Sequence, residues 1–111
     1  MKLAFVYAPV TDLDQGAAFY RDTLGWAEAW RDGDDTVAFA IPDSDVQVMV
    51  STTPQEAGPM YLVDDVAEFL AAHADLPVVV DPFAIPDGQV AGVADPAGNV
   101  LYVFDQAGGE S

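Results

Sequence analysis

The sequence contains no cysteine, and only three of its 111 residues are Lys or Arg. Without cysteine, neither a disulfide framework nor a thiolate metal site can form. Three basic residues stand against nineteen acidic ones, so nucleic acid is a poor partner, because phosphate contacts need Lys and Arg. No apolar run approaches the roughly 20 residues that a membrane-spanning helix needs. The apolar start of the chain is shorter than a signal peptide and predicts a first strand. We therefore expect a cytoplasmic protein with no membrane partner.

The resulting net charge of −16 has two explanations that the sequence leaves open. An acidic surface would attract a cationic ligand. Alternatively, the excess of Asp over Glu, with little Lys and much Ala, is typical of a high-GC or salt-adapted proteome, where acidity serves solubility.

The apolar content of 51% and the aromatic content of 11% predict one globular domain. Short apolar runs bounded by turn residues predict strands, and apolar residues at helical spacing predict two helices. Strands are predicted over residues 3–10, 26–30, 36–41, 46–51, 59–63, 77–85, 88–94 and 100–105; helices are predicted to follow Asp12 and Asp65, the first with a buried stripe of Leu13, Ala17, Tyr20 and Leu24 and an end at Gly25.

The second half of the chain repeats the pattern of the first. A shift of 53 residues places Asp12 on Asp65 and Tyr20 on His73. Each aspartate precedes a Gln or Glu by three residues, as in a capping box. An internal repeat of this length predicts two βαβββ modules. Their predicted bounds are about 3–51 and 59–105, with a linker over 52–58 and a C-terminal tail over 106–111.

Three segments, "VTDLDQGAAFYRDTLGW", "YLVDDVAEFLAAH" and "DPAGNVLYVFD", resemble the signature of the vicinal oxygen chelate superfamily, which includes glyoxalases, bleomycin resistance proteins and extradiol dioxygenases. The resemblance spans about residues 3–105. It implies an α+β fold in which two βαβββ modules form a cupped, eight-stranded mixed sheet around a cleft, with helices on the outer face. It also implies a homodimer.

Enzymes of this superfamily hold a metal ion through His, Gln or Glu at four strand positions. The matching positions here hold Phe5, Met49, Gly58 and Tyr102. Phenyl and glycine side chains offer no donor, and a thioether or a neutral phenol is a poor ligand for a divalent ion. We therefore predict no metal and no other cofactor. A shift of one residue in this assignment would bring Gln47 into the set.

Strand alternation predicts an aromatic lining for the cleft. The candidate ligand-binding residues are Phe5, Tyr7, Trp30, Phe39, Met49, Met60 and Tyr102. Such a lining suits a flat organic ligand, although the same side chains could instead fill a core. The leading hypothesis is a metal-free binding protein, similar to the bleomycin-resistance group, that holds an aromatic drug or metabolite and so confers antibiotic resistance. In one version of this hypothesis the ligand is also cationic.

The alternative is a glyoxalase- or dioxygenase-like enzyme, a lyase, isomerase or oxygenase, with an atypical or metal-independent site. Tyr7 or Tyr102 would then donate the proton. The single histidine, His73, is either a general base or a structural residue of the second helix; without partners we favour the structural role, packed on the back of the sheet. No residue is predicted to be catalytic.

Overall fold

The computed structural model describes residues 1–106, and the chain divides into two compact units. The first unit comprises residues 4–57, and the second comprises residues 1–3 together with the chain from Gly58 onward. Residues 107–111 of the predicted tail lie outside the described part. Among residues 1–106, none of the helices is both long and apolar enough to cross a bilayer.

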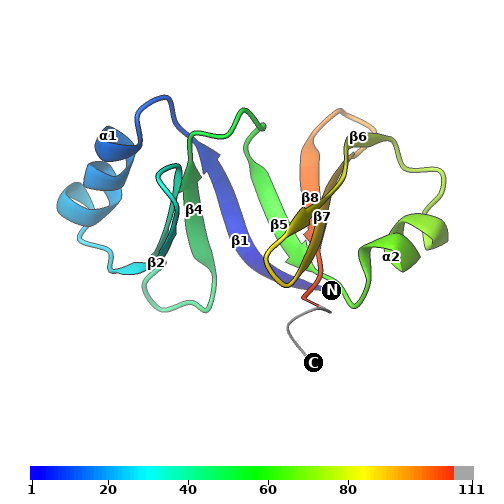
Figure 1. Cartoon of the computed structure of the whole chain (residues 1–111), viewed down its shortest axis with the longest axis horizontal. Coiled ribbons are helices and arrows are strands. Elements are labelled where there is room, and N and C mark those ends of the chain that lie inside the picture. Colours follow the sequence, from blue (N-terminus) through cyan, green and yellow to red (C-terminus); the bar gives the residue numbers. More distant parts are fainter. Residues whose placement is uncertain (107–111) are drawn as a thin grey trace. The chain divides into compact units, whose positions relative to one another are not determined.

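The first unit contains the elements of one βαβββ module (Figure 1). In chain order they are β1 (Lys2–Pro9), α1 (Leu13–Ala18), a π-helical turn η1 (Phe19–Thr23), β2 (Glu28–Asp32), β3 (Thr36–Ala40) and β4 (Gln47–Ser51). Strand order is β2-β3-β4-β1. Strand β1 runs parallel to β4, whereas β2–β3 and β3–β4 are antiparallel.

The helix of the first unit begins as predicted and ends differently. The Asp12 carboxylate accepts a hydrogen bond from the Gln15 amide at 3.0 Å, which caps α1. From Phe19 the helix widens, and the Leu24 amide bonds to the Phe19 carbonyl five residues back at 3.0 Å. A π turn rotates the residues that follow it. Leu24, predicted to be in the buried stripe, is therefore 42% exposed, which corrects that prediction.

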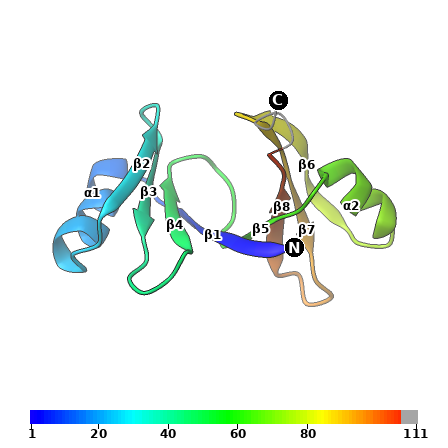
Figure 2. The ribbon, with the colours of Figure 1, turned by 90° about the horizontal axis from the view of Figure 1, so that it is seen from below.

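The second unit repeats this topology (Figure 2). Its elements are β5 (Gly58–Leu62), α2 (Val66–Ala72), β6 (Val78–Ile85), β7 (Gly88–Ala94) and β8 (Val100–Phe104). Strand order is β5-β8-β7-β6, with β5 parallel to β8 and the other pairs antiparallel. The predicted α+β class, with two βαβββ modules and eight strands of mixed direction, is confirmed. Strand β5 starts at Gly58, a residue that the sequence assigned to the linker.

One helix covers one face of each unit's strands. In the first unit, Ala17 of α1 joins four strand residues in a core cluster of Ala17, Val37, Phe39, Val48 and Val50. In the second unit, Val66 of α2 packs with Ala91 and Val103. We call these the helix-covered faces and the opposite sides the helix-free faces. Because strand side chains alternate, every second residue belongs to the helix-free face.

The second unit also contains a buried carboxylate that sequence reasoning did not single out. The Asp105 side chain accepts hydrogen bonds from the backbone amides of Val66, at 2.8 Å, and Gln89, at 2.9 Å. It thus connects the first residue of α2 to the β6–β7 hairpin. A carboxylate at this depth is tolerated because its oxygens are hydrogen-bonded. Its role is to hold these three segments together.

Candidate functional site

The helix-free face of the first unit carries most of the residues predicted to bind a ligand. Register places Phe5 beside Gln47 and Tyr7 beside Met49, and it places Met49 beside Ala38. Each of these pairs shares a face. The residues of the helix-free face are Phe5, Tyr7, Trp30, Thr36, Ala38, Gln47, Met49 and Ser51.

A half-buried aromatic corner lies on this face. The rings of Phe5 and Trp30 meet edge to face, with their centroids 5.9 Å apart. The Trp30 indole Nε1–H donates to Oε1 of Gln47 at 2.8 Å. All three side chains are partly exposed. The structure thus brings Phe5 and Trp30 together as predicted and adds a side-chain amide. Gln47 alternates in step with Met49, which is the sequence signal that places it on this face.

A chain of hydroxyl groups crosses the same face. The Tyr7 hydroxyl donates to the Thr53 carbonyl at 2.9 Å and also bonds to the Thr53 hydroxyl. From Thr53 the chain continues to Ser51 at 3.0 Å and from Ser51 to Thr36 at 2.9 Å. Thr36 donates to the Asp35 carboxylate at 2.9 Å. Sequence reasoning missed this network, which fixes the start of the linker to β1, β3 and β4.

The phenol of Tyr7 is therefore buried and hydrogen-bonded. Its side chain is 6% exposed, and Ser51 is 1% exposed. Buried hydroxyls of this kind are satisfied by one another and by backbone carbonyls. The network is structural support for the face on which the aromatic corner lies.

In the second unit, Met60 and Tyr102 are cross-strand neighbours on the helix-free face. Tyr102 is 4% exposed. Its ring lies between two glycines, because a Cβ on Gly92 would stand 3.2 Å from Tyr102 Cε1 and one on Gly58 would stand 3.5 Å from Cε2. Gly92 makes room for the aromatic ring, whereas a Cβ at Gly58 would first meet the Val100 carbonyl oxygen.

Phe39 does not lie with the other candidates. It pairs with Val48 and belongs to the helix-covered core, where it is 0% exposed. Its ring stacks on Tyr20, with the centroids 5.7 Å apart. The placement predicted by strand parity is therefore wrong for Phe39, because its neighbour Ala38 pairs with Met49 and Phe39 lies on the opposite face.

The residues at the four metal positions of the superfamily do not fit a metal ion. Phe5 packs against Trp30, and Tyr102 packs over Gly58 and Gly92. The carbonyl oxygen of Gln47, the nearest alternative ligand, already accepts the Trp30 hydrogen bond. Within residues 1–106, no three His, Cys, Asp or Glu side chains form a group that could hold a metal ion.

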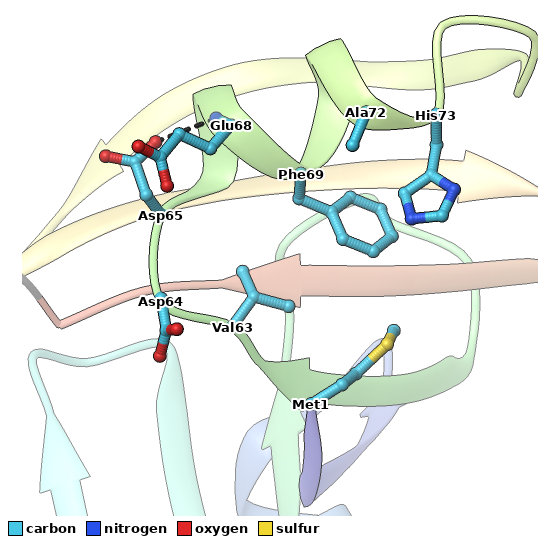
Figure 3. A pocket seen from close by; sticks show the side chains of 8 residues that line it. All are labelled: Met1, Val63, Asp64, Asp65, Glu68, Phe69, Ala72 and His73. Carbon is cyan, nitrogen blue, oxygen red and sulfur yellow. Dashed lines mark hydrogen bonds between the residues drawn. The ribbon is translucent and has the colours of Figure 1, made fainter.

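A shallow hollow of about 340 Å³ lies beside α2 in the second unit (Figure 3). Carboxylates of Asp64, Asp65 and Glu68 lie toward one end, and the Phe69 and His73 rings lie toward the other. Asp65 is occupied in capping α2, since it accepts from the Glu68 amide at 2.9 Å. The hollow contains none of the predicted ligand-binding residues.

His73 lies at this hollow and not on the sheet. Helix α2 ends at Ala72, and the His73 backbone leaves the helical region at φ −123° and ψ 51°. The imidazole is exposed and meets the Phe69 ring, with the centroids 4.6 Å apart. The predicted packing of His73 on the back of the sheet is therefore wrong, because the helix stops one residue too early.

Comparison with known proteins places this arrangement in a family. A family model described as the Glyoxalase/Bleomycin resistance protein/Dioxygenase superfamily matches residues 2–103. The chain belongs to this superfamily, which confirms the resemblance of its motifs. No curated protein matches the sequence.

Solved structures share the fold at low sequence identity. A structure described as the NAD-dependent benzaldehyde dehydrogenase from Legionella pneumophila has a TM-score of 0.75 at 13% identity, covering 92% of this chain and 97% of that one. Streptomyces coelicolor methylmalonyl-CoA epimerase, in complex with 2-nitronate-propionyl-CoA, has a TM-score of 0.72 at 17% identity, with 96% and 98% covered. A superfamily member from Vibrio splendidus 12B01 has a TM-score of 0.66 at 16% identity, with 91% and 95% covered. These identities establish the fold and no shared activity.

Proposed function

We propose that the protein is a metal-independent small-molecule-binding protein whose first unit holds a flat aromatic ligand against Phe5 and Trp30. The observation that carries this proposal is the partly exposed, edge-to-face pair on the helix-free face. The Phe39 ring in the core has no accessible surface, whereas the Phe5 and Trp30 rings are partly exposed. Offset or edge-to-face aromatic contacts contribute roughly 0.5–1.5 kcal/mol beyond the burial of area.

The charge of the chain favours a cationic ligand. A net charge of −16 draws cations toward the surface and repels anions. A cation above an aromatic face gains roughly 0.5–2 kcal/mol. The proposed ligand is accordingly an aromatic cation, drug or metabolite. Sequestration of a bleomycin-like drug would then be the route to antibiotic resistance.

Tryptophan fluorescence tests the proposal, because the chain has two tryptophans and one can be removed. Trp26 packs near Tyr20 in the core of the first unit. The variant Trp26→Phe therefore leaves Trp30 as the sole reporter at the corner. We expect N-methylacridinium, a flat permanent cation, to quench Trp30 saturably in the presence of EDTA, and bleomycin to compete with it.

Neutral acridine at pH 8 is the matched control ligand, since it has the same ring system without the charge. We expect weaker binding of acridine at low salt and a smaller difference between the two at high salt. Phe5→Ala should weaken both ligands. The proposal is wrong if Trp30 does not respond saturably to any of the three compounds, or if binding requires a stoichiometric transition metal.

The homodimer implied by the superfamily is a separate proposal. Analytical ultracentrifugation with and without N-methylacridinium checks it. A single species at twice the chain mass of 11.7 kDa supports the dimer, and a monomer at all concentrations contradicts it.

A further inference from the structure

The side-chain amide of Gln47 has a fixed orientation. An indole Nε1–H is only a donor, so the atom that faces it must be the amide oxygen. The Trp30 Nε1 to Gln47 Oε1 distance of 2.8 Å is that of a good hydrogen bond. The Gln47 amide nitrogen therefore points away from Trp30. Rotation of the amide by half a turn would bring two donors together, so this orientation is held.

The amide nitrogen of Gln47 is available to a ligand. Within residues 1–106 it makes no hydrogen bond, and no buried side-chain nitrogen or oxygen lacks a partner. The nitrogen therefore reaches accessible surface. Register sets Gln47 directly beside Phe5 on the neighbouring parallel strand. The two donor hydrogens thus lie next to the aromatic corner.

We infer that Gln47 donates a hydrogen bond to an acceptor on the bound ligand, a carbonyl oxygen or a ring nitrogen at the edge of its aromatic system. This inference rests on the proposed function and adds a ligand class to it. The ligand is a flat aromatic compound with an acceptor beside the ring, and any positive charge lies elsewhere on it. Trp30 has two roles here, as a stacking surface and as the group that orients Gln47.

Two compounds of matched shape test for the acceptor. They are 2-acetylnaphthalene, which has a carbonyl oxygen, and 2-isopropylnaphthalene, which has none. In ¹⁵N-labelled Trp26→Phe protein, the single indole N–H signal of Trp30 reports binding of either one. A net hydrogen bond of ordinary strength predicts roughly 2- to 12-fold tighter binding of the ketone.

The variant Gln47→Glu replaces the hydrogen-bond donor of the side chain with an acceptor and keeps the shape of the side chain. A glutamate oxygen can still accept from the Trp30 indole, while the donors are lost. We expect the preference for the ketone to disappear and binding of the donor 2-naphthylmethylammonium to strengthen. Gln89→Glu is the matched control, because Gln89 is exposed in the second unit and this change adds the same charge. It should leave the ketone preference intact.

The outcomes separate the two proposals. Equal affinities for the ketone and the hydrocarbon in Trp26→Phe protein that keeps Gln47 would overturn the role of Gln47 and leave aromatic binding standing. A response to neither compound would overturn the role of Gln47, and it would overturn aromatic binding as well if N-methylacridinium also fails to bind. A ketone preference that survives Gln47→Glu would also overturn the inference. Backbone amide signals of the first unit that stay in place away from residue 47 in unliganded Gln47→Glu protein show that the variant keeps the fold of the corner.

Discussion

The helix-free faces of the two units are built on equivalent strands and filled with different side chains. At an offset of 53 residues, Tyr7 corresponds to Met60 and Met49 corresponds to Tyr102. Tyr7 neighbours Met49 in one unit, as Met60 neighbours Tyr102 in the other, so tyrosine and methionine have exchanged strands. The same two side-chain types are neighbours in both units, but the tyrosine belongs to β1 in the first and to β8 in the second.

Other equivalent positions differ in polarity. Ser51 of the hydroxyl chain corresponds to Phe104, and Phe5 of the aromatic corner corresponds to Gly58. In the first unit the face therefore combines hydroxyls, an amide and two half-buried rings. In the second unit the Tyr102 ring lies over glycines, and Phe104 is buried. The first unit thus keeps two aromatic rings and one amide partly accessible, while the second unit uses its equivalent positions for packing.

The largest difference between the units is predicted for the loss of stability when Asp105 or its equivalent, Thr52, is replaced by alanine. Asp105→Ala leaves the buried amides of Val66 and Gln89 without their acceptor. At roughly 1–3 kcal/mol for each orphaned donor, we expect a loss of about 2–5 kcal/mol in the free energy of unfolding, measured by urea denaturation. Thr52 is exposed, and only its backbone amide bonds to Asp35. Thr52→Ala should change stability by less than about 0.5 kcal/mol. Equal effects at the two positions would contradict the account.

A smaller loss is expected from Gly92→Ala, where the new methyl would lie 2.9 Å from Val80 Cγ2 and 3.2 Å from Tyr102 Cε1. Overpacking of this kind costs roughly 1–3 kcal/mol. Truncation of Val80 in Gly92→Ala/Val80→Ala should recover part of the loss, which thermal denaturation measures. In the first unit Ala38 pairs with Met49 as Gly92 pairs with Tyr102, and Ala38 carries a Cβ and is fully buried. If Gly92→Ala is neutral, the glycine is not needed for the Tyr102 ring.

The two helix caps should behave alike. Asp12 and Asp65 each accept from the amide three residues on, at 3.0 and 2.9 Å. Replacement of either by alanine should cost about 1 kcal/mol, and replacement by serine should cost little. Hydrogen exchange of the amides in the first turn of each helix measures the local effect. A loss at one helix only would break the equivalence of the repeat.

The smallest effect is a dependence on pH in the turn before β8. Hydrogen bonds from the Asn99 side chain and backbone, with lesser ones from Ala97 and Gly98, hold the pKa of Asp95 below its usual value of 3.8. A lowered folded-state pKa gives a stabilisation that is present above pH 3.8 and lost as the pH falls through the folded pKa. The Asn99 amide shift should titrate with a midpoint below 3.8.

The corresponding turn of the first unit is the control for this titration. There the Ser44 hydroxyl accepts from the Val46 amide at 2.9 Å. A hydroxyl does not ionise in this range, so the hydrogen bond from Val46 to Ser44 gives this turn no stabilisation that depends on pH. A midpoint at or above 3.8 for Asn99 would show that these hydrogen bonds do not favour the charged form of Asp95.

Local patterns were enough to predict the strands, both caps and the repeat, because these depend on alternation and on side chains a few residues apart. The π turn at Phe19 and the early end of α2 at Ala72 depend on tertiary packing, so Leu24 and His73 were misplaced. Phe39 was misplaced because alternation alone does not say which set of alternate residues faces the helix, and in β3 that set contains Phe39.

The site could be predicted only in part for the same reason. Alternation brought Phe5, Tyr7 and Met49 to one face, since these strands are regular. The hydroxyl chain joins Tyr7 to Thr53, 46 residues away, and nothing local in the sequence indicates such a contact. The hydrogen bond that orients Gln47 is likewise a contact between distant strands.

The most direct test of the central claim is the titration of Trp30 emission in Trp26→Phe protein with N-methylacridinium, after EDTA treatment. We predict saturable quenching with one ligand per chain, and a marked loss of affinity in Phe5→Ala. Quenching that stays linear with concentration, or that appears only when a divalent metal is restored, would contradict the account.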